Sequence, residues 1–199
     1  MFESSVQAQA DLRWILPFKR GETAWIYGAA PVLEESLEAV GVKIRPLDPV
    51  NFVPAEADYL LAPNIGAKEA ETLIALGKQA VRPGGYVLLG LRKAAFLEVL
   101  IGKSSSDWVR LSNIFRRLRM AEFMLRSTFG VFYSLEEPRF LISLETRQPS
   151  RYFWRRLYLP PSRLDFWKRC LAILLTDLGL QRCLYSAFVL TAQRRRAEC

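Results

Sequence analysis

Hydrophobic and polar positions follow two alternating patterns along the first half of the chain. Short apolar runs bounded by turn residues predict strands, and apolar residues spaced three or four apart predict helices. The patterns predict four strands and two helices, with strands at 23–27, 42–48, 57–62 and 86–91 and helices at 31–40 and 68–81. Strands alternating with helices of this length are typical of a parallel sheet with right-handed crossovers. We therefore expect an α/β protein with a Rossmann-like, mostly parallel sheet flanked by helices.

Turn residues mark the expected ends of these elements. Pro31 stands where proline favours the first helical position, and Gly41 stands where glycine favours a left-handed helix end. Pro63 and Asn64 predict a turn after the third strand. The run Arg-Pro-Gly-Gly at 82–85 predicts the end of the second helix.

The second half is less regular and predicts an antiparallel end to the sheet. Its expected elements are a helix at 108–120, strands at 123–132 and 139–146, a helix at 163–178 and a strand at 183–192. We expect a single domain over 1–199, divided into a helical cap at 1–22, a Rossmann-like half at 23–91 and a basic, aromatic-rich half at 92–199.

Composition points to an ordinary globular protein of 199 residues. The first residues lack a basic start followed by an apolar core, and the longest apolar runs are too short for a membrane span. The cysteines are odd in number and have no CxxC spacing, which argues against a disulfide framework and a zinc site: Cys170, Cys183 and Cys199. We therefore expect a cytoplasmic protein with reduced thiols and no metal.

The chain contains no histidine. This excludes Ser-His and Cys-His nucleophile pairs and the usual general base of neutral pH. Methyl transfer from a sulfonium donor suits that restriction, because the leaving group is already activated and alignment of the reactants supplies much of the rate.

Charge is divided unevenly between the two halves. Residues 1–90 have a net charge of −3 and residues 91–199 a net charge of +11. Such a basic half indicates an anionic partner, either nucleic acid or a lipid surface, or else a solvated basic face without a specific partner.

The segment 79–89, in which a helix feeds a Pro-Gly-Gly turn and then an apolar strand, resembles class I S-adenosylmethionine-dependent methyltransferases. In that family this turn precedes the fifth strand. The resemblance covers residues 20–150 loosely and the Pro-Gly-Gly region closely. It implies a shortened member of the fold, because only residues 49–56 separate the second and third strands, where the family places a helix and a strand.

The same resemblance implies a cofactor loop after the first strand. The loop residues would be Tyr27, Gly28, Ala29 and Ala30, and only Gly28 matches the glycine pattern well. Ala30 and Val32 occupy the second and third glycine positions, so the loop is degenerate. Either the loop still admits S-adenosylmethionine, or the protein has lost the ability to bind this cofactor.

Two polar residues at strand ends complete the implied site. Asp48 is similar in place to the family's ribose-binding carboxylate, and Asn64 lies where the fourth strand meets the active-site loop. Each has an equally good interpretation as a turn-forming residue.

Arginines among aromatic residues are the most unusual feature of the second half. The arginines proposed to contact an anionic partner are Arg116, Arg117, Arg119, Arg151, Arg155 and Arg156. Arginine is a forked phosphate donor, and aromatic rings stack on bases or anchor in lipid headgroups. In the competing interpretation the aromatics fill the core and the arginines extend into solvent.

Two hypotheses therefore stay open. In the first, the chain is a methyltransferase-like enzyme that binds S-adenosylmethionine near Gly28 and Asp48, with an unknown acceptor and catalytic base. In the second, it is a non-catalytic module with the same fold that binds nucleic acid, an anionic membrane or a protein partner.

Overall fold

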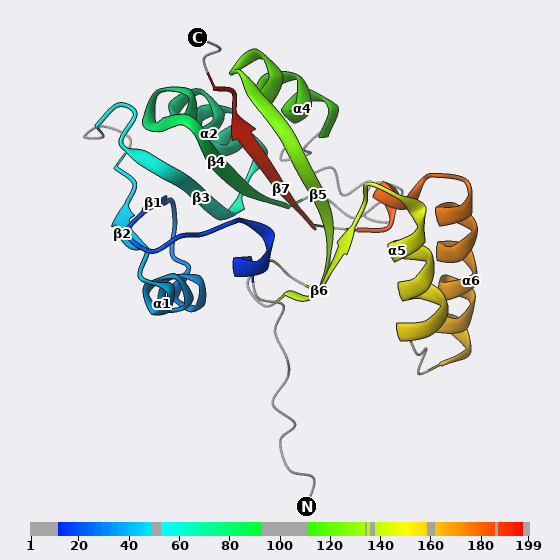
Figure 1. Ribbon diagram of the computed structural model, residues 1–199. Coiled ribbons are helices and arrows are strands. Elements are labelled where there is room, and N and C mark those ends of the chain that lie inside the picture. Colours follow the sequence, from blue (N-terminus) through cyan, green and yellow to red (C-terminus); the bar gives the residue numbers. More distant parts are fainter. Residues whose placement is uncertain are drawn as a thin grey trace, which may run out of the picture.

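The described part of the chain contains one mixed sheet of seven strands (Figure 1). The computed structural model describes residues 12–48, 53–92, 111–133, 135, 138–158, 162–185 and 187–196. The strands are β1 (Thr23–Ile26), β2 (Lys43–Pro46), β3 (Ala57–Ile65), β4 (Val81–Arg92), β5 (Phe123–Tyr133), β6 (Pro138–Ser143) and β7 (Ala187–Arg194). Their order across the sheet is β2-β1-β3-β4-β7-β5-β6.

Strand directions confirm the predicted α/β class. Strands β2, β1, β3 and β4 are parallel to one another. Strand β7 is antiparallel to both β4 and β5, and β6 is antiparallel to β5. The sheet is therefore parallel in the first half of the chain and antiparallel at the C-terminal end, as the sequence predicts.

Helices cover both faces of the sheet (Figure 1). The helical elements are η1 (Leu12–Ile15), α1 (Pro31–Val40), α2 (Ala67–Ala80), α4 (Leu111–Met120), α5 (Arg147–Tyr152), α6 (Arg163–Asp177) and η3 (Gln181–Cys183), and a π-helical turn, η2 (Phe153–Leu157), follows α5. Helices α2 and α4 pack on one face, and α1 and η1 pack on the other. The result is a three-layer arrangement.

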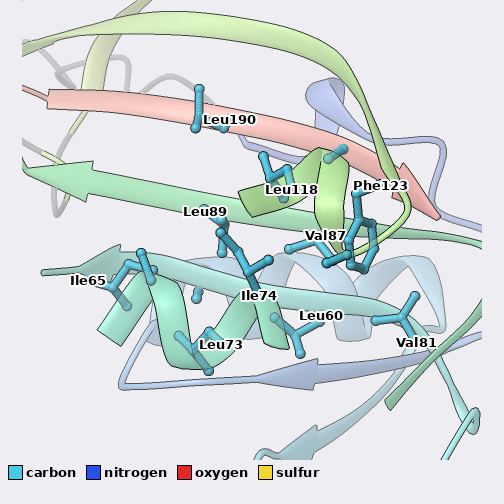
Figure 2. Close-up of a cluster of buried hydrophobic side chains, with 14 of the residues drawn as sticks. Leu60, Ile65, Leu73, Ile74, Val81, Val87, Leu89, Leu118, Phe123 and Leu190 are labelled. Atoms are coloured by element: carbon cyan, nitrogen blue, oxygen red, sulfur yellow. The ribbon is translucent and has the colours of Figure 1, made fainter. Parts of the chain in front are cut away.

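Alternate residues of β4 supply the cores on both faces. Val87, Leu89 and Leu91 point toward α2 and α4, whereas Leu88 points toward α1. Figure 2 shows the first of these cores, with Val87 and Leu89 among side chains of α2, α4 and β7. A strand buried on both faces needs a continuous apolar run, which is the pattern found at 86–91.

A third cluster attaches the α5–α6 helix pair to the antiparallel end of the sheet. Phe153 and Trp154 of η2 and Ala172 of α6 pack with Phe188 of β7. Tyr185 lies against Gly130 of β5, and its hydroxyl is 3.1 Å from the Ser150 hydroxyl oxygen. Burial raises the pKa of the Tyr185 phenol.

The structure corrects two predicted turns. Pro63 and Asn64 belong to β3 and do not form a turn. The register between β3 and β4 shifts between Ala62 and Ile65, and this irregularity accommodates a proline that has no N–H for the ladder. Helix α2 ends before the Pro-Gly-Gly turn, at Ala80, and residues 81–85 belong to β4.

Gly84 is left-handed, with φ of +86°, but it does not end the helix. It lies in a bulge of β4, because Ala57 pairs with Val81 whereas Tyr59 pairs with Tyr86. Three extra residues on β4 therefore turn at this glycine.

Three other boundaries differ from the prediction. Strand β7 begins at Ala187 and not at residue 183, since residues 181–183 form η3. Strand β6 ends at Ser143, before the predicted limit of 146. The helical cap predicted over 1–22 contains a short 3₁₀ turn where it is described, and residues 1–11 lie outside the described residues.

Candidate functional site

The carboxyl ends of β1, β2 and β3 meet at one edge of the sheet. The Tyr27 N–H donates to the Leu61 carbonyl oxygen at 2.8 Å, and the Leu47 N–H donates to the Ile26 carbonyl oxygen at 2.8 Å. The first bond holds Tyr27 beside β3, and the second holds Leu47 beside the end of β1. This carboxyl edge is where open parallel sheets bind ligands.

The loop after β1 is open at its glycine. Gly28 has φ of +82°, a conformation that favours glycine, and a Cβ placed there would have no heavy atom within 4 Å. Its neighbour Ala29 is exposed, and Tyr27 and Ala30 are partly buried. The backbone of this loop is therefore accessible to a ligand.

The first turn of α1 carries a carboxylate. The Ala30 N–H donates to Glu34 Oε1 at 3.1 Å, and Pro31 has no N–H to donate. Backbone N–H groups at a helix N-terminus can bind an anion. Here the Ala30 N–H is already bonded to Glu34, and Pro31 has no N–H. The loop has negative character beside Gly28.

A second carboxylate lies beside Tyr27. The Tyr27 hydroxyl lies 3.4 Å from Glu69 Oε1, and the Gly66 N–H donates to Glu69 Oε2 at 2.7 Å. Tyr27 and five residues of α2 line a pocket of about 220 Å³. The five residues are Lys68, Glu69, Thr72, Leu73 and Leu76. Our sequence reasoning missed Glu69. Its position three residues after Gly66, the spacing of a helix capping box, was the available signal.

Asp48 and Asn64 also lie at the carboxyl edge. Asp48 follows β2 directly after Leu47, and Asn64 is the second-last residue of β3; both are exposed. The structure therefore places all six predicted cofactor residues along the ends of β1, β2 and β3. Their binding roles stay predictions.

The six predicted anion-binding arginines do not form one surface. Arg116, Arg117 and Arg119 lie on α4, whereas the other three lie on α5 and η2, in a separate part of the molecule (Figure 1). Arg117 pairs with Glu71 at 2.7 Å. The structure thus separates two basic groups that the sequence analysis treated together.

Asp177 neutralises part of the second group. Arg151 pairs with it at 3.0 Å and Arg155 at 3.7 Å. Within the described part of the chain, Arg116, Arg119 and Arg156 pair with no carboxylate.

Aromatic residues of the basic half are divided between core and surface. Phe153 and Trp154 are buried in the third cluster, whereas Tyr152 and Trp167 are exposed. Tyr158 is partly buried and packs against the same cluster. The interpretation that aromatics fill the core is therefore correct for Phe153, Trp154 and Tyr158 but not for Tyr152 and Trp167.

A polar network lies at the other end of the parallel strands, where β1, β3 and β4 begin. Our sequence reasoning also missed this network. The Thr23 N–H donates to Asp58 Oδ2 at 2.7 Å, and Arg82 pairs with both Asp58 and Glu22. The hydroxyl of the buried Tyr59 donates to Glu22 and contacts the Pro17 carbonyl oxygen at 2.8 Å. The signal in the sequence was a charged residue, Asp58, at the start of a buried strand.

Burial is the largest cause of a raised Tyr59 pKa, and the carboxylates of Glu22 and Asp58 raise it further. A pocket of about 240 Å³ opens beside this network. We refer to this end of the parallel strands as the amino edge.

Comparison with solved structures identifies the fold. The chain is similar to an S-adenosylmethionine-dependent methyltransferase from Archaeoglobus fulgidus, with a TM-score of 0.52, 10% identity, and coverage of 92% of this chain and 91% of that chain. This chain has the class I methyltransferase-like fold. The methyltransferase-like fold is also found in phosphoethanolamine N-methyltransferase 2 from Haemonchus contortus, solved with S-adenosyl-L-methionine, at a TM-score of 0.50 and 12% identity.

That match covers 94% of this chain, which spans only 51% of the length of the Haemonchus enzyme. No protein-family model matches the sequence, and no curated protein matches it significantly. The Pro-Gly-Gly turn lies in the fourth described strand, β4, where the family counts a fifth.

No helix of the described residues is long and apolar enough to cross a membrane. No group of three or more His, Cys, Asp or Glu side chains is placed there to hold a metal ion.

Proposed function

We propose that this chain is a methyltransferase-like protein that binds S-adenosylmethionine at the carboxyl edge of its parallel strands. The observation that carries the proposal is the open, left-handed Gly28 at the end of β1 in a sheet of methyltransferase-like topology. A Cβ-free backbone at this point lets the ligand approach closely. When bound, the cofactor supplies an activated methyl group on a sulfonium.

Different residues of this edge would contact different parts of the cofactor. Backbone of residues 27–30 would contact the methionine part and the adenosine, and the Asp48 carboxylate would accept hydrogen bonds from the ribose hydroxyls. Asn64 at the end of β3 would face the acceptor side. Support comes from their common position along one sheet edge.

The charge of the loop narrows the type of cofactor. Glu34 accepts the Ala30 N–H at the start of α1, so its carboxylate occupies the position where a dinucleotide would need phosphate donors. A carboxylate there favours a ligand with cationic groups, and S-adenosylmethionine carries an ammonium and a sulfonium. A pyrophosphate-containing cofactor would be repelled.

Chemistry at this edge would depend on alignment. The chain has no histidine, and the proposal assigns no general base. Holding the acceptor in line with the methyl group is the main contribution that such a site makes to the rate. The acceptor stays unassigned.

Isothermal titration with S-adenosylmethionine and S-adenosylhomocysteine tests the proposal. We expect binding by the wild type and its loss in Gly28→Val, whose side chain would fill the loop. Gly21→Val is the matched control, because Gly21 is also left-handed, at φ of +85°, and equally open, but precedes β1. Absence of heat at millimolar ligand would remove the proposal, and so would equal loss in both variants.

A second candidate function is a binding module that has lost the cofactor. Pro31 and the Glu34-capped Ala30 favour it, because they leave the loop with fewer donors than a glycine-rich loop. In this case Arg116 and Arg119 would contact an anionic partner. Salt-dependent binding of RNA or DNA, weakened in Arg116→Gln, together with no response to either cofactor, would support it.

A further inference from the structure

The outward face of α6 is apolar. Five large side chains, each between 55% and 71% exposed, repeat at intervals of three and four residues: Leu164, Trp167, Leu171, Leu174 and Leu178. Residues at these intervals share one face of a helix. The inward face carries the small buried residues Ala172 and Thr176. We call the five residues the α6 stripe.

The α6 stripe lies at the periphery of the molecule. Helix α6 packs on α5 and η2, and α5 lies between it and the sheet (Figure 1). Nothing in the described chain covers the stripe, since all five of its members remain more than half exposed. A contiguous apolar surface of this kind on a soluble domain marks an interaction site.

Cations border the stripe on both sides. Arg163 lies four residues before Trp167, and Lys168 lies four residues after Leu164, so each shares the outward face with the stripe. Lys168 also contacts Asp165 at 2.9 Å, and this pairing raises its pKa. Arg163 pairs with no carboxylate of the described residues.

The surrounding segment is strongly basic. Residues 145–182 contain eight Lys and Arg against three Asp and Glu, a net charge of +5. Asp177, one of the three acids, is already shared by Arg151 and Arg155. The stripe is thus an apolar band in a cationic surface.

An apolar stripe within a cationic surface suits some classes of partner better than others. Leucine side chains neither pair with phosphates nor stack on bases, so a nucleic acid would leave the stripe unused. A second copy of the chain would bring two surfaces of net charge +5 together, which repel each other. An anionic bilayer accepts both parts, with apolar side chains below the headgroups and cations among the phosphates.

We propose that the α6 stripe docks on the headgroup layer of an anionic membrane. Trp167 and the leucines would enter the boundary between headgroups and acyl chains, while Arg163 and Lys168 contact lipid phosphates. The helix would lie in the plane of the interface. The inference concerns attachment alone and is independent of cofactor binding.

Flotation of the full chain with vesicles tests it. We expect binding to vesicles of mixed phosphatidylcholine and phosphatidylserine, weakening as salt rises, and little binding to phosphatidylcholine alone. The double variant Trp167→Ser/Leu171→Ser should bind at least about tenfold more weakly. Trp14→Ser is the control, because Trp14 is 87% exposed on a different element, η1.

The competing partners are outcomes of the same test. Failure to float with anionic vesicles overturns the proposal, as does equal loss of binding in Trp14→Ser. Dimerisation in sedimentation equilibrium that disappears in the double variant would assign the stripe to a second copy. RNA binding that disappears in the double variant would assign it to nucleic acid. Circular dichroism melting shows whether each variant is folded, and since both substituted side chains are exposed we expect unchanged melting.

Discussion

The two edges of the parallel sheet carry similar residue types but use them differently. At the amino edge, Glu22, Asp58 and Arg82 satisfy one another and a backbone N–H, around the buried Tyr59. At the carboxyl edge, Asp48 and Asn64 are exposed, and Gly28 opens the loop beside them. Asp58 is buried and paired with Arg82, so we expect the amino edge to contribute more to stability than the exposed ends of the strands. The amino edge thus carries a network that joins β1, β3 and β4, and the carboxyl edge carries the residues proposed to bind the cofactor.

The largest expected effect comes from the contact that brings β3 and β4 together near the carboxyl edge. A Cβ on Gly90 would overlap the backbone carbonyl of Pro63, which cannot move without displacing β3. We expect Gly90→Ala to lower the free energy of unfolding by more than about 3 kcal/mol, or to prevent folding. Urea denaturation measures it.

Gly28→Ala is the comparison for that variant, because its Cβ meets open space and only the left-handed backbone opposes it. We expect a cost of about 1–2 kcal/mol. Equal costs at the two glycines would contradict the close approach of β3 and β4.

The next effect sets matched carboxylates of the two edges against each other. Asp58→Ala removes the acceptor of the Thr23 N–H and a partner of Arg82, so we expect a loss of about 2–3 kcal/mol in urea denaturation. Asp48→Ala, at an exposed side chain, should cost less stability than Asp58→Ala. If Asp48→Ala were the more damaging substitution, the division between a structural and a binding edge would be wrong.

Alkaline pH should weaken the amino edge. The pKa of Tyr59 is raised above its ordinary value of 10.0, first by burial and then by Glu22, so folding favours the neutral phenol. Its stabilisation is fully present below pH 10 and is lost as the pH rises above that value. We expect the free energy of unfolding to decline above pH 10 and Tyr59→Phe to reduce that decline.

Tyr27→Phe, at the carboxyl edge, is the control for the alkaline titration and should retain the decline of the wild type. Urea denaturation at a series of pH values measures all three proteins. A decline as steep in Tyr59→Phe as in the wild type would show that another group causes it.

The smallest expected effect concerns the cap of α2 at the carboxyl edge. Glu69→Ala removes the acceptor of the Gly66 N–H, at a cost of about 0.5–1 kcal/mol in urea denaturation. Glu69→Gln keeps an acceptor at that position and should cost less. If Glu69→Ala lowered the free energy of unfolding more than Asp58→Ala, the assignment of the structural network to the amino edge would be contradicted.

Local signals in the sequence were sufficient for the parallel half. Pro31 and Gly41 set the ends of α1 where the structure has them, since each residue acts on the backbone conformation at its own position. The prediction for β3 ended too early because of Pro63. A strand can contain this proline only because the pairing with β4 is irregular there, and no local signal in the sequence reveals that irregularity. The apolar run of β4 was recognised because burial on both faces leaves no polar positions.

Long-range contacts account for the rest. The Thr23 N–H and Asp58 are 35 residues apart, and Tyr59 and Glu22 are 37 apart, so composition alone could not pair them. The same holds for Asp177, which binds Arg151 and Arg155 from another helix and removes part of their charge. The common location of the candidate residues at one edge was predictable, because parallel strands end on the same side.

Amide chemical-shift mapping during titration with S-adenosylhomocysteine tests the central claim most directly. The account predicts shifts concentrated at Tyr27 to Ala30 and near Asp48 and Asn64, with the amides around Glu22 and Asp58 unchanged. No shifts at saturating ligand, or shifts centred on the amino edge, would contradict it.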